Sequence, residues 1–277
     1  MEIDAVLVAI DGSSMARSAF DAGLAFARQA ELPVHLVTAA LSDDVVDPLD
    51  ERRAELHELR ELAGAPRSHG HLLLEVDPAD AILAVAERLG NVLVCMGTHG
   101  RRRVSWALLG SVAEHVIRHS RFPVLLAGPQ RRGRTERYEQ VFIALDGSAC
   151  AEAALPLAQR LSTVLSAPLT LVSVADEDDR HPQAQRRLTA AYLRQTADGL
   201  AGPAPVGTAV LGGEVSRALA EELPLDGALL VMSTHGRSGL DRITLGSVAS
   251  SVCRRARLPV VVARPATLGQ TPGAGGC

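Results

Sequence analysis

The sequence contains no lysine, so all 28 residues counted as lysine plus arginine are arginine. This absence excludes sites that need a lysine ammonium group: the phosphate-binding lysine of P-loop proteins, a Schiff-base lysine and the catalytic lysine of protein kinases. A phosphate group bound by this chain must therefore be held by backbone N–H groups, hydroxyl groups, histidine or arginine.

Aromatic residues make up only 3% of the chain and the formal net charge is -4, so we expect no nucleic-acid partner. The four cysteines form no C-x-x-C pair and show no spacing typical of zinc sites, which predicts no metal site and a reducing environment. The sequence has no run of 18 apolar residues, and no signal-peptide pattern follows Met1. We therefore expect a cytoplasmic protein without a membrane partner.

The chain repeats itself, and at 277 residues it is long enough for about two domains. Four blocks recur in the same order: residues 7–13, 98–101, 109–113 and 123–127 return as residues 142–148, 234–237, 245–249 and 259–263. The offset is 135 residues for the first block and 136 for the others. We predict two copies of one domain, over residues 1–130 and 138–265, followed by a flexible tail over residues 266–277.

Each copy alternates between apolar runs and segments with helical periodicity. In the first copy, strands are expected at residues 5–10, 34–39, 72–76, 92–96 and 123–127, with helices at 49–62, 79–89 and 111–119 and another helix after the first strand. The pattern predicts an α/β fold: two tandem doubly wound (Rossmann-like) domains, each with a five-stranded parallel sheet. Pro156 falls in the second copy's first helix, where we expect a bend rather than a break.

Two loops of each copy carry residues suited to binding a ligand. Asp11-Gly12-Ser13 follows the first strand, and Gly97-Thr98-His99-Gly100 follows the fourth; nine residues later, Gly110-Ser111 begins a helix. Ligands of open parallel sheets bind at such carboxyl ends, glycine allows close backbone approach, and helix N-termini offer unpaired N–H groups. The pattern returns in the second copy and predicts a phosphate site in each, although glycine turns after strands also occur without a ligand.

These blocks resemble the universal stress protein family in a tandem, two-domain form. The resemblance rests on Asp-Gly-Ser after each first strand and on the G-x-x-G-x9-G-[ST] pattern of the family's ATP-binding branch. It implies ATP or another adenine nucleotide as cofactor, Mg²⁺ bound through the phosphates, and a regulatory role in stress. It also implies that the fifth strands, within residues 124–127 and 260–263, pair as an intrachain pseudo-dimer. A further homodimer and a protein partner of unknown identity stay open.

The resemblance places Asp11 and Asp146 near adenine and ribose, and an adenine pocket would need apolar cover from Ala39 and Val174. The predicted nucleotide contacts of the first copy are Ala9, Asp11, Gly12, Ser13, Ala39, Met96, Gly97, Thr98, His99, Gly100, Arg101, Gly110, Ser111 and Val112. Those of the second copy are Ala144, Asp146, Gly147, Ser148, Val174, Met232, Ser233, Thr234, His235, Gly236, Arg237, Gly246, Ser247 and Val248. The two arginines either pair with phosphate oxygens or are solvated surface residues.

Two departures from the family pattern support a different class of function, a nucleotide-free interaction scaffold. Ser233 replaces the first glycine, where its side chain would crowd the ribose or hydrogen-bond to it, and Trp106 is either a packing anchor or a lid. No carboxylate pair or Ser/His/Asp arrangement supports His99 or His235 as a general base, so we predict no catalytic residue. A nucleotide-free interaction scaffold of the same fold and a slow ATPase remain the alternatives.

Overall fold

The computed structural model describes residues 2–40, 49–64, 68–74, 76–100, 109–128, 135–175, 181–200, 205–224, 226–234 and 245–264. The first copy contains β1 (Ala5–Ala9), α1 (Ser14–Gln29), β2 (Val34–Ala40), α2 (Leu49–Ala63), β3 (Ser68–Leu74), α3 (Pro78–Leu89), β4 (Val92–Gly97), α4 (Ser111–His119) and β5 (Val124–Ala127). The second contains β6 (Gln140–Ala144), α5 (Ala149–Glu152), α6 (Leu155–Leu165), β7 (Leu169–Ala175), α7 (Pro182–Asp198), β8 (Gly207–Gly212), α8 (Val215–Glu221), β9 (Ala228–Ser233), α9 (Ser247–Arg255) and β10 (Val260–Ala263).

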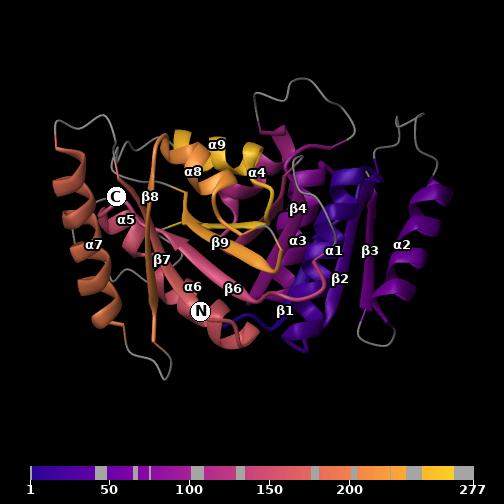
Figure 1. Cartoon of the computed structure of the whole chain (residues 1–277). Helices are drawn as coiled ribbons and strands as arrows, with labels where there is room; N and C mark the ends of the chain where they lie inside the picture. The colour runs from indigo at the N-terminus through magenta and orange to yellow at the C-terminus, as the bar shows by residue number, and fades with distance from the viewer. Residues whose placement is uncertain are drawn as a thin grey trace.

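The described strands form one ten-stranded sheet in the order β3-β2-β1-β4-β5-β10-β9-β6-β7-β8. Neighbouring strands are parallel within each half, and the two halves lie side by side (Figure 1). They join at the centre of the sheet, where β5 and β10 pair antiparallel with Leu125 opposite Val261. The sheet confirms the predicted fold class of two five-stranded parallel units. The antiparallel pair at its centre is also the pairing expected of the fifth strands.

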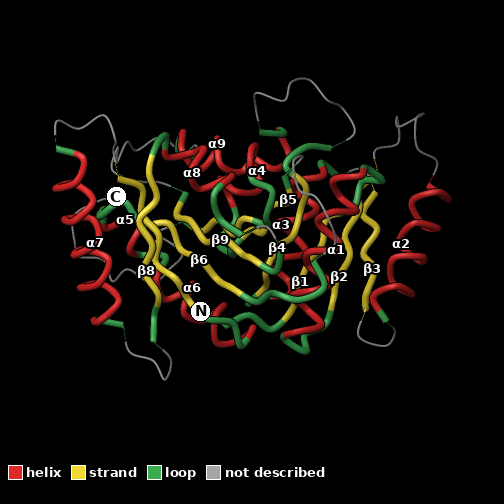
Figure 2. Tube along the Cα trace, in the orientation of Figure 1, coloured by secondary structure: helices red, strands yellow, loops and turns green. Residues whose placement is uncertain are grey.

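Helices cover both faces of the sheet (Figure 2). Because side chains alternate along a strand, Val6 and Val8 of β1 join one buried cluster with Phe20 of α1, whereas Leu7 joins another with Val85 of α3. The first cluster lies under α1, α2, α5, α6 and α7, and the second under α3, α4, α8 and α9. Each cluster contains residues of both copies, so the two copies share a continuous core.

Side-chain capping explains where two helices of the first copy begin. The Ser13 hydroxyl accepts a hydrogen bond from the Ala16 N–H at 3.1 Å at the start of α1, and Asp77 accepts one from the Ala79 N–H at 2.8 Å at the start of α3.

The strand expected at residues 72–76 instead spans Ser68–Leu74, because residue 76 lies in the bend leading into α3. Its polar first half gives no apolar run, since β3 is an edge strand.

The bend expected at Pro156 was wrong, because the helix there is broken. Four residues of α5 are followed by Ala153 and Ala154 before α6 begins at Leu155, with the proline in its first turn. Proline has no N–H to donate and its ring clashes with the carbonyl four residues earlier, here that of Glu152. Both intervening residues keep right-handed helical backbone angles.

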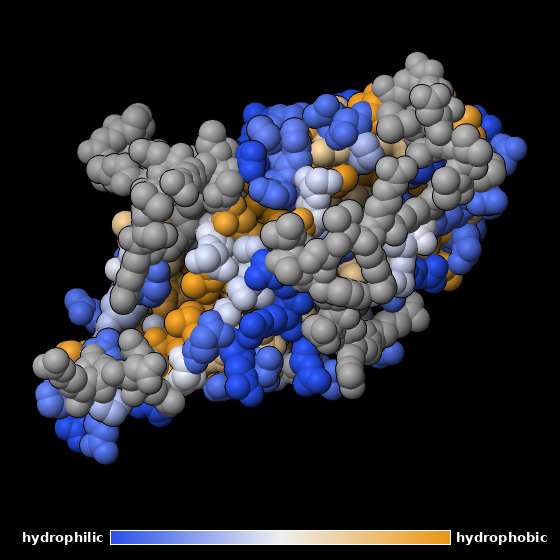
Figure 3. Space-filling model, turned by 90° about the horizontal axis from the view of Figure 1, so that it is seen from above, coloured by the Kyte–Doolittle hydropathy of each residue, from blue (hydrophilic) through white to orange (hydrophobic). Residues whose placement is uncertain are grey.

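Exposed apolar side chains do not gather in one place within the described residues. Those that are large and at least 40% exposed belong to α2, β3, α7, α8 and α9: Leu49, Leu62, Leu74, Leu188, Val215 and Val248. On the face seen in Figure 3, hydrophobic residues lie in separate small areas among hydrophilic ones. None of the described helices has both the length and the apolar character needed to cross a membrane.

A buried contact joins the first copy to the segment that enters the second. Tyr138 is completely buried; its hydroxyl donates to the Ala22 carbonyl of α1 at 3.0 Å, and its ring meets Phe26 edge to face with 6.3 Å between centroids. The Gln29 amide donates to the Tyr138 carbonyl at 2.8 Å and accepts from the Tyr138 N–H at 2.7 Å. The end of α1 thereby fixes the backbone that leads into β6.

Removing the Tyr138 ring should cost far more stability than removing its hydroxyl. We expect Tyr138→Phe to lower the free energy of unfolding by about 1 kcal/mol through the lost hydrogen bond, and Tyr138→Ala to lower it by about 3–5 kcal/mol through the cavity. Urea unfolding of the full chain measures both. Equal losses in the two variants would contradict the packing role of the ring.

Candidate functional site

The loops after β1 and β4 lie beside each other because these strands are neighbours in the sheet. Gly100 lies directly against the carboxylate of Asp11, since a Cβ atom built on this glycine would be 2.6 Å from Oδ2 of Asp11. A side chain at residue 100 would therefore displace the carboxylate. The structure brings together the two segments that the strand order predicts at one edge of the sheet.

A tight turn fixes each aspartate at the end of its strand. Oδ1 of Asp11 accepts a hydrogen bond from the Ser13 N–H at 3.0 Å, and the glycine between them has a φ of 78°. Oδ1 of Asp146 accepts from the N–H and the hydroxyl of Ser148 at 3.0 and 2.6 Å. Each carboxylate is thus oriented by its own loop before any ligand is considered.

The chain returns to the end of β4 at Gly110. Its N–H donates to the Thr98 carbonyl at 2.8 Å, and a Cβ atom at Gly110 would be only 2.9 Å from that same oxygen. Thr98 is fixed in turn because its N–H donates to the Ala127 carbonyl of β5 at 3.1 Å. The second copy repeats the closure, with the Gly246 N–H donating to the Thr234 carbonyl at 2.8 Å.

This closure places two helix N-termini beside the loops. Gly110 and Gly246 occupy the N-cap positions of α4 and α9, and neither helix has a side chain capping its first N–H groups, whereas side chains cap α1 and α3. Ser111 and Ser247, the first helical residues, are exposed. Uncapped N–H groups carry partial positive charge and suit an anion.

The remaining predicted contacts differ in their accessibility. Exposed residues are Gly12, Gly100, Ser111, Gly147, Ser247 and Val248; half-buried ones are Ala9, Asp11, Ser13, Gly97, Gly110, Val112, Ala144, Asp146, Ser148, Val174 and Gly246. Buried ones are Ala39, Met96, Thr98, His99, Met232, Ser233 and Thr234. Nδ1 of His99 lies 3.1 Å from the Thr98 hydroxyl, which ties the ring to its loop. Arg101, Trp106, His235, Gly236 and Arg237 lie outside the described residues.

The two copies also differ at the end of the fourth strand. A Cβ atom on Gly97 would be 2.8 Å from the Cβ of Met15 and 3.1 Å from its carbonyl carbon, so α1 leaves no space there. In the second copy Ser233 is 7% exposed, and strand alternation directs its side chain to the face covered by α5 and α6. Met15 was not identified from the sequence as part of this site. A signal was available, because both residues of the contact change together in the second copy: Cys150 takes the place of Met15, and Ser233 that of Gly97.

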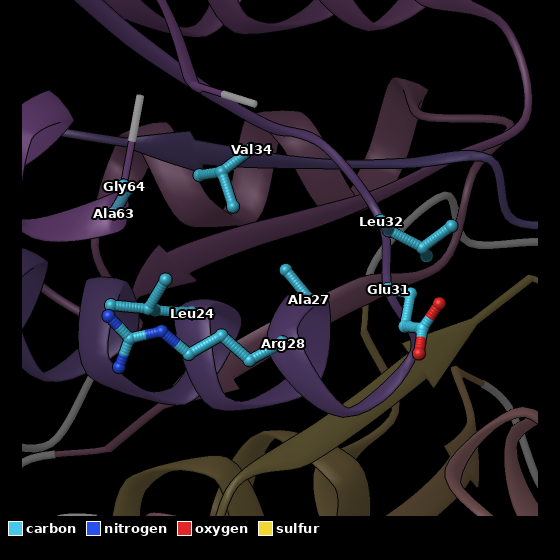
Figure 4. Close-up of a pocket in the computed structure, with 8 residues that line it drawn as sticks. All are labelled: Leu24, Ala27, Arg28, Glu31, Leu32, Val34, Ala63 and Gly64. Carbon is cyan, nitrogen blue, oxygen red and sulfur yellow. The ribbon is translucent and has the colours of Figure 1, made fainter. Parts of the chain in front are cut away.

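One cavity among the described residues lies elsewhere in the first copy. It has a volume of about 190 Å³, and its lining comes from the end of α1, the start of β2 and the end of α2: Leu24, Ala27, Arg28, Glu31, Leu32, Val34, Ala63 and Gly64 (Figure 4). Val34 begins β2, so this cavity opens at the amino end of the strands, opposite the loops. It is also smaller than typical ligand sites of about 300–1,000 Å³.

Three histidines and an arginine form a separate polar cluster on β2, β3 and α3. Nδ1 of His35 lies 3.0 Å from Nε2 of His71, whose Nδ1 lies 3.1 Å from Nη2 of Arg88; the His69 ring stacks on His35 at 4.7 Å. Because a guanidinium only donates, His71 must accept at Nδ1 and donate from Nε2 to His35. Both imidazoles are therefore neutral in this arrangement.

Burial and neighbouring charges act in the same direction on these rings. Burial, followed by electrostatic repulsion of a proton on His35 by His69, His71 and Arg88, lowers the pKa of His35 to about 4, and burial with repulsion by Arg88 and His69 lowers the pKa of His71. The sheet register puts Thr170, Gly207 and Ala209 at the corresponding positions of the second copy, so only the first copy has the cluster. No described group of His, Cys, Asp or Glu is arranged to hold a metal ion.

Taken together, the fold and its loops define a tandem α/β protein in which each half places an aspartate turn and an uncapped helix N-terminus at the carboxyl ends of its parallel strands. The sequence profile of the universal stress protein family matches residues 2–128 and again residues 137–264. The chain therefore belongs to the universal stress protein family.

Individual relatives are distant. One universal stress protein of Mycobacterium tuberculosis is 27% identical over 213 residues, covering 73% of this chain and 70% of that protein. Another from the same organism is 28% identical over 184 residues, covering 62% and 61%, so this chain spans about three fifths of the length of that relative. A crystal structure of a universal stress protein from Archaeoglobus fulgidus has the same fold, with a TM-score of 0.65 at 21% identity over 95% of this chain and 97% of that one.

Exchanging the residues at the ends of β4 and β9 tests the packing of α1. Gly97→Ser should lower the free energy of unfolding by about 1–3 kcal/mol, because its side chain must displace α1. Ser233→Gly, the matched control, removes a side chain and should cost less, about 0.5–1 kcal/mol. Urea unfolding compares the two. A Gly97→Ser variant as stable as the parent chain would contradict the contact with Met15.

The histidine cluster predicts that the chain loses stability in acid. The pKa of His35 is about 4 when folded and about 6.5 when exposed, so the unfolded chain takes up the proton first as the pH falls through this range. His35→Ala should flatten the fall in unfolding free energy between pH 6.5 and pH 4. Thr170→Ala, at the equivalent position in β7, controls for lost packing and should leave the slope unchanged. A His35→Ala profile parallel to that of the parent chain would refute the assignment.

Proposed function

We propose that this chain is a regulatory universal stress protein that binds an adenine nucleotide, ATP in the first instance, in each of its two copies. The observation that carries the proposal is the meeting of Asp11 with the Gly100 loop beside the uncapped N-terminus of α4. The second copy repeats the aspartate turn and the uncapped helix. Family membership and the glycine spacing support the same ligand class.

The residues present fit a polyphosphate without any ammonium group. The N–H groups at the starts of α4 and α9 and the hydroxyls of Ser111 and Ser247 would bind phosphate oxygens. The carboxylates of Asp11 and Asp146 would accept hydrogen bonds from the nucleoside. Mg²⁺ would enter with the phosphates, neutralising part of their charge. We place the protein in the cytoplasm, where nucleotide levels report on metabolic state.

The glycines that close the loops supply a direct test. Gly110→Ala and Gly246→Ala together should weaken ATP binding at least about tenfold, or ~1.4 kcal/mol per site. The Cβ added at residue 110 meets the Thr98 carbonyl that fixes the start of α4, and Gly246 occupies the equivalent position at the start of α9. Gly199→Ala at the end of α7 is the control, since its Cβ would make ordinary contacts of 3.5 Å. Calorimetric titration should give two ATP per parent chain. Thermal unfolding of every variant separates lost binding from lost folding.

Two results would decide between this proposal and its alternatives. Mass spectrometry of small molecules released from the purified protein should show an adenine nucleotide. Absence of binding in equilibrium dialysis at millimolar ATP would contradict the proposal and favour a nucleotide-free interaction scaffold. Turnover of bound ATP well above the rate in the Asp11→Asn, Asp146→Asn double variant would instead identify a slow ATPase.

A further inference from the structure

The antiparallel junction turns the two halves of the sheet in opposite directions. Because β5 and β10 run antiparallel, the carboxyl ends of the first copy's strands lie at one edge of the sheet and those of the second copy lie at the other. Helix α4 connects the carboxyl end of β4 to the amino end of β5, so it crosses the sheet from the first loop pair towards the edge that holds the second. Its nine residues span about 13 Å at 1.5 Å per residue. Helix α9 makes the reverse crossing on the same face, near the centre (Figure 1).

A hydrogen bond attaches the far end of α4 to the second copy. Nη1 of Arg264 donates to the Arg118 carbonyl at 2.5 Å. This carbonyl is in the last turn of α4, where carbonyls have no partner within the helix and a cation is favourable. Arg264 directly follows Ala263, whose carbonyl accepts the Thr234 N–H at 3.0 Å. The same short segment therefore contacts the end of α4 and fixes the loop after β9.

The equivalent contact in the other direction uses backbone alone. Gly128 directly follows β5 and takes the position that Arg264 has after β10. A Cβ atom on Gly128 would be 2.7 Å from the Cys253 carbonyl and 3.1 Å from the Ala256 carbonyl, so its backbone packs on the C-terminal end of α9. The neighbouring Ala127 carbonyl accepts the Thr98 N–H of the first loop pair.

These contacts form a closed circuit through both loop pairs. The Thr98 carbonyl holds the Gly110 N–H at the start of α4, and the Thr234 carbonyl holds the Gly246 N–H at the start of α9. The end of each helix then meets the segment that fixes the other copy's threonine. One helix and one contact thus connect the start of each helix with the loop of the opposite copy.

We propose that α4 and α9 couple the two loop pairs, so that a ligand held at one helix N-terminus changes the affinity of the other. The ligand, a nucleotide, rests on the function proposed above, whereas the coupling is a property of the unliganded chain. Coupling between sites is reciprocal and typically changes affinity by about 5- to 150-fold. Arg264 is the residue on which the link from α4 depends.

Amide hydrogen exchange without nucleotide tests the coupling itself. Gly110→Ala perturbs the start of α4 and should accelerate exchange of the Thr234 and Gly246 amides in the second copy by about fivefold or more. Ser111→Asp, an exposed change that adds negative charge to the helix start, should slow the exchange of the same two amides. This variant replaces Gly110→Ala in the test if Gly110→Ala unfolds the first copy. In the Arg264→Ala background these remote changes should disappear while those near residue 110 persist. Arg254→Ala, which removes a bond within α9 to Ser250, should preserve them.

The outcomes separate the coupling from nucleotide binding. Exchange changes confined to the first copy, or remote changes that survive Arg264→Ala, would overturn the coupling even where calorimetry shows two bound ATP. Remote changes that depend on Arg264 in a chain that fails to bind millimolar ATP would establish the coupling and refute the proposed ligand. Where both hold, ATP saturation of the first site should alter exchange at Thr234 and Gly246 in the parent chain and not in Arg264→Ala.

Discussion

The antiparallel pairing of β5 with β10 is the constraint on which the arrangement of this molecule depends. It joins two parallel sheets into one, gives both copies a shared core on each face, and removes an exposed edge from each half. It also fixes the direction of every other element, because strands within each half are parallel. The two loop pairs consequently lie at opposite edges, and the helices on the faces run between those edges.

Close backbone approach is the second constraint, and it explains the local sequence of the first copy's loop pair. Gly97 leaves space for α1, Gly100 for the Asp11 carboxylate and Gly110 for the Thr98 carbonyl. Each contact brings a helix or a turn nearer to the strand ends than a side chain would permit. The second copy relaxes one of these contacts at Ser233, and there the helix that follows the first strand is broken. The same fold thus tolerates two packings of this helix against the fourth strand.

Much of this architecture could be predicted from the sequence, for physical reasons that also show the limits. Buried parallel strands such as β1 and β4 are continuous apolar runs, and these runs predicted the fold class. The repeated blocks mark equivalent elements in the two copies, and they predicted the positions of the loops. The third strand was predicted at residues 72–76 instead of Ser68–Leu74, because the first half of the edge strand β3 is polar and gives no apolar signal. The effect of Pro156 was predicted wrongly, as a bend in one helix, because the sequence does not show whether packing keeps a helix continuous past a proline. Contacts between copies, such as Tyr138 on α1 and Arg264 on α4, join residues more than 100 positions apart and carry no local pattern.

The absence of lysine links the chemistry of the site to its mechanics. A lysine side chain could follow a phosphate by changing rotamer, leaving the backbone where it was. Here the proposed donors include main-chain N–H groups at the starts of α4 and α9, so adjusting them to a ligand means moving the helices that carry them. Helices transmit such movements along their axes, and the far ends of these two rest on Arg264 and Gly128 of the opposite copy. A site built from helix backbone in this fold is therefore poorly insulated from its duplicate, which gives the tandem arrangement a physical consequence that two separate domains would lack.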